Sequence, residues 1–145
     1  MIDWAQQRCT EVVVVVNTKQ GEAVPGHLRA QWLQELHPAA HVVQVEHNLH
    51  NDWDDQDLWA RWIELLQSKW PITSGPSSKG PEVVVSSDFY IAELARRLGA
   101  LPLICDPERV HVPISATLIR NDPATHLELL APQVRDWVER NWLNM

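Results

Sequence analysis

The sequence predicts an α/β fold in which helices cover both faces of a doubly wound parallel sheet. Short β-branched runs alternate along the chain with longer segments whose apolar residues recur every three or four positions, which is the pattern of a βαβ protein. The longest run, residues 12–16, is five consecutive valines. A continuous β-branched run is typical of a strand that is buried on both faces.

The first half of the chain supplies two strands and three helical segments. Residues 2–10 have the spacing of the end of a helix, with Ile2, Ala5 and Cys9 on one side, and residues 12–16 form the first strand. Residues 17–26, which include Gly21, Pro25 and Gly26, form a loop before a helix over 27–36. Residues 42–45 form the second strand, and a helix over 54–69 follows.

The second half continues the alternation after a loop over 70–81 that is rich in proline, glycine and serine. Residues 83–85 form a third strand, 91–98 a helix that Gly99 ends, and 103–105 a short fourth strand. Pro132 begins the last amphipathic helix, which carries Val134, Trp137, Val138 and Trp142.

Length and composition limit the class of protein. A chain of 145 residues with 45% apolar residues is expected to form a single domain, 1–145, with one core. Its net charge of −7 argues against a nucleic-acid partner, since no basic stripe is available for a phosphate backbone. No apolar run is long enough to span a membrane. Cys9 and Cys105 lack metal-type spacing, so we expect reduced, buried thiols in a cytoplasmic protein.

The segment 113–120 combines the features of an anion site at the start of a helix. Pro113 blocks a preceding helix, Ser115 is a good N-cap, and Thr117 and Arg120 follow on the first turn. Backbone N–H groups, a hydroxyl and a guanidinium would converge there on a negative group such as a polyphosphate. An ordinary capped amphipathic helix with a solvated Arg120 explains the same spacing.

The run Ile-Ser-Ala-Thr-Leu-Ile-Arg resembles the Ile-Ser-x-Thr-x-Ile-Arg signature of the nucleotidylyltransferase superfamily, and specifically of nicotinamide mononucleotide adenylyltransferases of the bacterial NadR type. Further segments resemble the family in the same order. Upstream these are Val-Val-Ser-Ser-Asp-Phe-Tyr, Ala-Arg-Arg-Leu-Gly-Ala and Asp-Pro-Glu-Arg, and downstream Asn-Asp-Pro and Leu-Ala-Pro-Gln-Val-Arg.

The resemblance implies a Rossmann-like, adenine nucleotide alpha hydrolase-like sheet with strand order 3-2-1-4-5. The family's first strand, which ends in a Gly-x-Phe-x-Pro-x-His-x-Gly-His loop, is expected to be missing, because the sequence aligns from the helix that follows that loop. Residues 12–16 and 83–85 would then lose the strand between them, at a cost of about 1–3 kcal/mol for each buried backbone group left unpaired. We expect these two strands to move together and pair directly. A strand lent by another chain, or a longer natural protein, are the alternatives, and an exposed strand edge favours a homo-oligomer.

The chemistry that the resemblance implies is adenylyl transfer from ATP, with Mg²⁺, to nicotinamide mononucleotide. Ser115, Thr117 and Arg120 would bind the β and γ phosphates, and Arg120 would offset charge on the leaving pyrophosphate. Arg29 would lie near a phosphate, or be a solvated helix arginine. Trp53 would stack on the nicotinamide ring, or pack in the core. Ser86, Ser87 and Asp88 would contact the adenosine, or Ser87 or Asp88 would cap a helix.

Two other sets of residues are of the types that form metal or nucleophile sites. His41, His47, His50, Asp52 and Asp54 match no compact metal motif, so no metal site is predicted. Neither cysteine has a place in adenylyl transfer, so neither is expected to act as a nucleophile. A non-catalytic nucleotide-binding or interaction module of the same fold is the alternative function, because the histidine loop is absent from the sequence.

Overall fold

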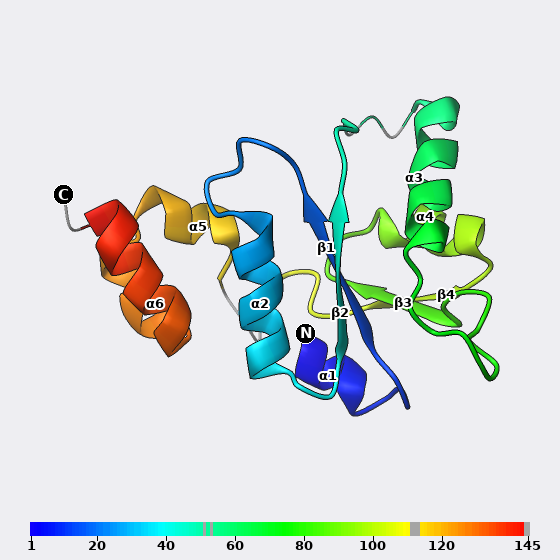
Figure 1. The fold of residues 1–145 in the computed structure, drawn as a ribbon, viewed down its shortest axis with the longest axis horizontal. Coiled ribbons are helices and arrows are strands. Elements are labelled where there is room, and N and C mark those ends of the chain that lie inside the picture. Colours follow the sequence, from blue (N-terminus) through cyan, green and yellow to red (C-terminus); the bar gives the residue numbers. More distant parts are fainter. Residues whose placement is uncertain (51, 53, 111–113, 144–145) are drawn as a thin grey trace. The chain divides into compact units, whose positions relative to one another are not determined.

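A computed structural model describes residues 1–50, 52, 54–110 and 114–143 of the chain (Figure 1). The backbone divides into two compact units, Met1–Cys105 and Asp106–Met145, and each is described by itself. That residues 1–145 form a single domain stays a prediction.

The first unit contains two parallel strand pairs. Strand β1 (Val13–Thr18) pairs with β2 (His41–Glu46) in a register that sets Val13 opposite His41, and β3 (Val83–Ser86) pairs with β4 (Leu101–Ile104) with Val83 opposite Leu101. The α/β class is therefore confirmed. The expectation that residues 12–16 and 83–85 pair directly is wrong, because β1 and β3 belong to different two-stranded sheets.

One edge of β1 has no strand partner within the described residues. The His41 amide donates to the Val12 carbonyl and the His47 amide to the Thr18 carbonyl, both at 2.9 Å. Backbone groups alternate sides along a strand, so Val13 and Val15 direct theirs to the opposite edge. Val15 is 39% exposed while Val16 is 5% exposed. The prediction that this strand is buried on both faces is wrong at Val15, because a two-stranded ladder offers too little surface to be covered all round.

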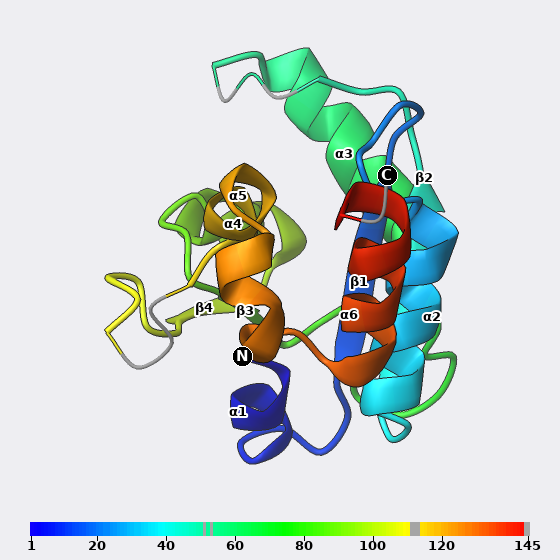
Figure 2. The same ribbon diagram turned by 90° about the vertical axis from the view of Figure 1, so that its left-hand side faces the viewer.

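Helix α2 (Gly26–Leu36) covers the β1–β2 pair and runs alongside both strands (Figures 1 and 2). It starts one residue earlier than predicted, directly after Pro25, and it buries Trp32. Gly26 is buried against the end of β1, where an added Cβ atom would lie 2.1 Å from Thr18 Oγ1. Only glycine permits this approach of helix and strand.

Two further helices complete this part of the unit. Helix α1 (Ile2–Gln6) is shorter than the predicted 2–10, and the His37 ring lies 3.4 Å from the carboxylate of its Asp3. Helix α3 (Gln56–Ser68) starts after Asp55, whose carboxylate accepts the Leu58 amide at 3.1 Å. The apolar side of α3 buries Leu58 and Trp59.

Helix α4 (Ile91–Leu98) packs on the β3–β4 pair and buries Ile91 and Ala95 there. Gly99 ends it with φ of 70°, as predicted. Glu93 accepts hydrogen bonds from both Arg96 and Arg97, and Arg97 also donates to Gln56 Oε1 at the start of α3.

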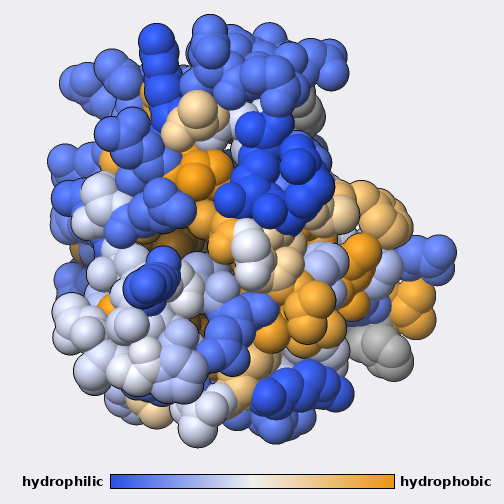
Figure 3. All heavy atoms as spheres, turned by 90° about the vertical axis from the view of Figure 1, so that its right-hand side faces the viewer, coloured by the Kyte–Doolittle hydropathy of each residue, from blue (hydrophilic) through white to orange (hydrophobic). Residues whose placement is uncertain are grey.

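Strand β4 starts two residues before the predicted 103–105 and includes Pro102. The Leu101 amide donates to the Glu82 carbonyl and the Cys105 amide to the Ser86 carbonyl. Backbone groups alternate sides along a strand, so the nitrogen of Pro102 points away from β3. Pro102 is tolerated because its missing N–H would face the outer edge. Leu101 of this strand is 70% exposed. On the face of the molecule drawn in Figure 3, hydrophobic residues gather at the surface beside strongly hydrophilic ones.

The second unit is helical. Helix α5 (Ala116–Asn121) is followed by a 3₁₀ segment, η1 (Ala124–Leu129), which the sequence did not predict. Helix α6 (Pro132–Val138) starts at Pro132 as predicted and continues into a π-helical turn, η2 (Glu139–Leu143). Arg135 of α6 connects this helix to η1, since its guanidinium donates to the carbonyls of Leu127 and Leu130 at 3.0 and 3.3 Å.

Candidate functional site

The start of α5 has the cap that the sequence predicts. Ser115 has extended backbone angles, and its Oγ accepts the Leu118 amide at 3.2 Å. Thr117 and Arg120 are three residues apart and therefore share a face of the helix. An Arg120 Nη atom donates to Thr117 Oγ1 at 3.4 Å, and both residues are exposed. The structure thus brings Thr117 and Arg120 together and gives Ser115 Oγ a capping role. Pro113 lies outside the described residues.

The first turn of α5 also offers backbone donors. Its Leu118 and Ile119 amides are taken by the side chain and carbonyl of Ser115, whereas the Ala116 and Thr117 amides bond no other group in the described part of the chain. With only six residues, α5 has a small dipole, so these amides, the Thr117 hydroxyl and the Arg120 guanidinium would carry any attraction for an anion.

A second arginine, Arg109, approaches the same helix start and was not among the predicted site residues. Its guanidinium donates to the Ile114 carbonyl, directly before the cap, at 3.2 Å. The turn that carries it is tight: Asp106 and Arg109 have φ of 47° and 55°, and the Asp106 carboxylate accepts the Val110 amide at 2.8 Å. Such backbone angles are uncommon for residues other than glycine. The Asp-Pro-Glu-Arg segment was the signal that could have identified Arg109.

Arg29 in the first unit is engaged by its own loop. Its guanidinium lies 2.6 Å from Glu22 Oε1 and donates to the carbonyls of Asn17 and Val24 at 3.1 and 3.3 Å. These bonds fix the loop between β1 and α2. A phosphate at Arg29 would have to compete with Glu22, and the phosphate role stays a prediction.

Ser87 and Asp88 follow β3 at its carboxyl end, as predicted, whereas Ser86 is the last residue of the strand. Ser86 Oγ accepts the Asp88 amide at 3.1 Å. The N-cap of α4 is Tyr90, without a side-chain capping bond, so the alternative that Ser87 or Asp88 caps this helix is wrong. The turn adds a feature that sequence reasoning missed, because Phe89 is 72% exposed there. An exposed aromatic ring is a surface on which a flat ligand can stack.

Trp53, the predicted stacking residue, lies outside the described residues. Near it in sequence, Trp62 of α3 packs its indole edge-on against His47 with ring centroids 4.4 Å apart. Burial lowers the pKa of His47, and the positive charge of Lys19 lowers it further. The position of Trp62 in the sequence does not indicate this contact.

A hollow in the first unit lies away from the predicted site residues. It has a volume of about 530 Å³, opens widely to solvent, and lies at the start of β2. Ligands of doubly wound α/β sheets bind instead beyond the carboxyl ends of the strands. None of the predicted site residues is among those lining it, which are Gln34, Pro38, Ala39, Ala40, His41, Val42, Val43 and Pro71. Both cysteines are free thiols, and Cys105 is buried while Cys9 is half-buried.

Comparison with known proteins gives no family assignment: no family model matches the chain, and no curated protein is significantly similar to it. Among the described residues, every helix is too short or too polar to cross a lipid bilayer.

Proposed function

We propose that the chain binds ATP, with Mg²⁺, and transfers its AMP group to nicotinamide mononucleotide. The observation that carries the proposal is the bond from Arg120 to Thr117, beside two helix amides that bond no group in the described part of the chain. Thr117 lies in the first turn of α5, whereas Arg120 lies in its last turn and not in the predicted first turn. A hydroxyl, a guanidinium and adjacent amides are the donors that bind polyphosphates in proteins. The resemblance of residues 114–120 to the nucleotidylyltransferase signature favours a nucleotide over other anions.

In this reaction the phosphate of the mononucleotide attacks the α-phosphorus of ATP. A new P–O bond forms there, the bond to the bridging oxygen breaks, and pyrophosphate leaves with the electron pair. No covalent enzyme intermediate is needed, so the protein contributes position and charge. Arg120 would offset the negative charge that grows on the leaving group, and Mg²⁺ would enter with ATP.

The proposal includes a Rossmann-like architecture of the adenine nucleotide alpha hydrolase type, to which β1 to β4 would contribute four strands. Support comes from the partners that the strands have. In the order 3-2-1-4-5, β1 and β2 would be the family's strands 2 and 3, and β3 and β4 its strands 4 and 5. The pairs β1–β2 and β3–β4 are neighbours in that order, and β1 and β3 are not.

The test is a pair of measurements on Arg120→Ala and on a matched control, Arg140→Ala. Arg140 is also an exposed arginine of the second unit, and its guanidinium bonds the Asp136 carbonyl, away from the signature. Calorimetric titration with MgATP should show about 10- to 100-fold weaker binding for Arg120→Ala, since a hydrogen bond to a charged group contributes about 1.5–3 kcal/mol. The control should bind like the unaltered chain. Equal binding by all three would refute the assignment of Arg120.

A non-catalytic nucleotide-binding module is the second candidate. It is favoured by the sequence, which contains no His-x-Gly-His segment to hold the reacting phosphates. A coupled assay of dinucleotide formation separates the two candidates, because the module would bind MgATP without forming the dinucleotide, whereas the enzyme would do both.

A further inference from the structure

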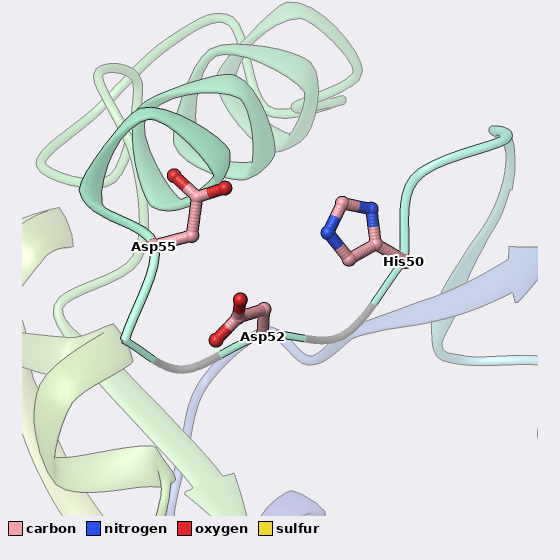
Figure 4. A group of neighbouring side chains, drawn as sticks. All are labelled: His50, Asp52 and Asp55. Atoms are coloured by element: carbon pink, nitrogen blue, oxygen red, sulfur yellow. The ribbon is translucent and has the colours of Figure 1, made fainter.

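The loop between β2 and α3 brings together three side chains of the kind that bind metal ions. One ligand atom from each of His50, Asp52 and Asp55 lies within 4.8 Å of the other two (Figure 4). We propose that these residues form a binding site for a divalent transition-metal ion, with Zn²⁺ as the test ion. The inference goes beyond the proposed function and does not depend on it.

The ligand set has the chemistry of such a site. Imidazole nitrogen and carboxylate oxygen bind Zn²⁺ at about 2.0–2.2 Å, so ligand atoms around one ion lie about 3–4 Å apart. Small side-chain rotations would therefore close the observed separations around an ion. The two carboxylates balance the charge of a divalent cation. His50 and Asp52 are exposed, so water would complete the coordination.

The protein backbone holds the three residues while leaving ligand atoms available. The His50 carbonyl accepts the Trp62 indole N–H at 3.4 Å, and the Asp55 amide donates to the Asp52 carbonyl at 3.2 Å. The side-chain bonds of the two aspartates, from the amides of Leu58 and Asp54, use their Oδ1 atoms. Each carboxylate thus keeps a second oxygen for an ion.

The charge of this segment supports a bound cation. Residues 46–57 carry five carboxylates and no lysine or arginine; the acidic residues are Glu46, Asp52, Asp54, Asp55 and Asp57. Their mutual repulsion is relieved by a positive ion. The imidazole of His50 distinguishes the group from a solvated acidic surface, because it adds a nitrogen ligand that transition metals accept and Mg²⁺ does not favour.

No metal site was predicted from the sequence, because the spacing of the candidate ligands matches no metal motif. Those candidates were His41, His47, His50, Asp52 and Asp54. The structure joins only His50 and Asp52 of that set, and adds Asp55. The position of the Asp55 carboxylate is set by its hydrogen bond as the N-cap of α3. Sequence spacing does not predict this position, so Asp55 was not among the candidate ligands.

Calorimetric titration of the full chain with Zn²⁺ tests the site, and Asp54 supplies the control. Asp54→Asn removes the same charge from the same loop but no ligand, so its affinity should stay within about twofold. Asp52→Asn, Asp55→Asn and His50→Ala should each bind at least about 10-fold more weakly. Asparagine at position 55 still caps a helix, and circular dichroism would verify that the variant is folded.

Two outcomes would overturn the proposal. If Asp52→Asn and Asp54→Asn weaken Zn²⁺ binding equally, the effect is one of general charge and there is no triad. If His50→Ala leaves Zn²⁺ affinity unchanged, the imidazole is not a ligand and the carboxylates act as a diffuse counterion site. Titration with Mg²⁺ gives an internal comparison, since the histidine variant should hardly affect its weaker binding.

Discussion

Replacing Gly26 by alanine tests how closely α2 approaches β1. In a helix, alanine is normally favoured over glycine by about 0.5–1 kcal/mol. Here the added Cβ would lie 2.1 Å from Thr18 Oγ1, 2.2 Å from Thr18 Cγ2 and 2.6 Å from Thr18 Cβ. We therefore expect the opposite sign, a loss of stability.

The size of the loss follows from those separations. Ordinary contacts of a Cβ atom begin at 3.4 Å, so helix and strand would have to separate by roughly 1 Å or more. Rotation of the Thr18 side chain relieves only the clashes with Oγ1 and Cγ2, because its Cβ moves with the backbone. Overpacking of this kind costs about 1–3 kcal/mol. We expect Gly26→Ala to lower the free energy of unfolding by about 2 kcal/mol.

Urea denaturation followed by tryptophan fluorescence would measure the change, and substitutions at Thr18 provide a matched rescue. Thr18→Gly removes all three clashing atoms, whereas Thr18→Ala leaves the Cβ at 2.6 Å. In double-mutant cycles, Thr18→Gly should therefore suppress most of the Gly26→Ala effect and Thr18→Ala only part of it. If Gly26→Ala is as stable as the unaltered chain or more stable, the close packing of α2 on β1 is wrong.

Two further predictions concern α4. Hydrogen bonds from Arg96 and then Arg97 lower the pKa of Glu93 to about 2 from an ordinary 4.5. The contribution of the Glu93 carboxylate to the free energy of unfolding is therefore present above about pH 4.5 and is lost as the pH falls toward 2. Glu93→Gln should make the free energy of unfolding depend less on pH in that range, as measured by urea denaturation at each pH. Ile91 is 1% exposed, so Ile91→Ala should cost about 2–5 kcal/mol and Ile91→Val about 0.5–1.5. Equal midpoints for the two Ile91 variants would contradict the burial of this side chain.

Local signals in the sequence predicted the ends of several elements. Gly99 ends α4 in the left-handed conformation, Ser115 caps α5, and Pro132 starts α6, all as expected. Each signal acts within one turn of the chain, through a backbone angle or a single side-chain bond. Such interactions do not depend on the rest of the fold, and they can therefore be predicted from the sequence.

Pairing between distant strands was predicted less well. The valine run identified β1, but its pattern could not show that β2 would be its partner within the described residues, or that Val15 would be exposed. The same limit applies to the candidate sites. The contact of Thr117 with Arg120 follows from helical spacing. By contrast, the bond from Arg109 to the Ile114 carbonyl depends on an unusual turn, and the position of Asp55 near His50 depends on a helix cap.

The ring at Pro102 decides where the β3–β4 sheet can be enlarged. A polypeptide laid against the outer side of β4 would meet a pyrrolidine where it needs a hydrogen-bond donor, and the ladder would be interrupted there. The carbonyls of Glu82, directly before β3, and of Ser86, at its end, accept hydrogen bonds from the β4 segment. The N–H and C=O groups of Val83 and Val85 point to the opposite edge, where no described strand pairs with them. Growth of this sheet, by whatever segment, is therefore directed to its valine side.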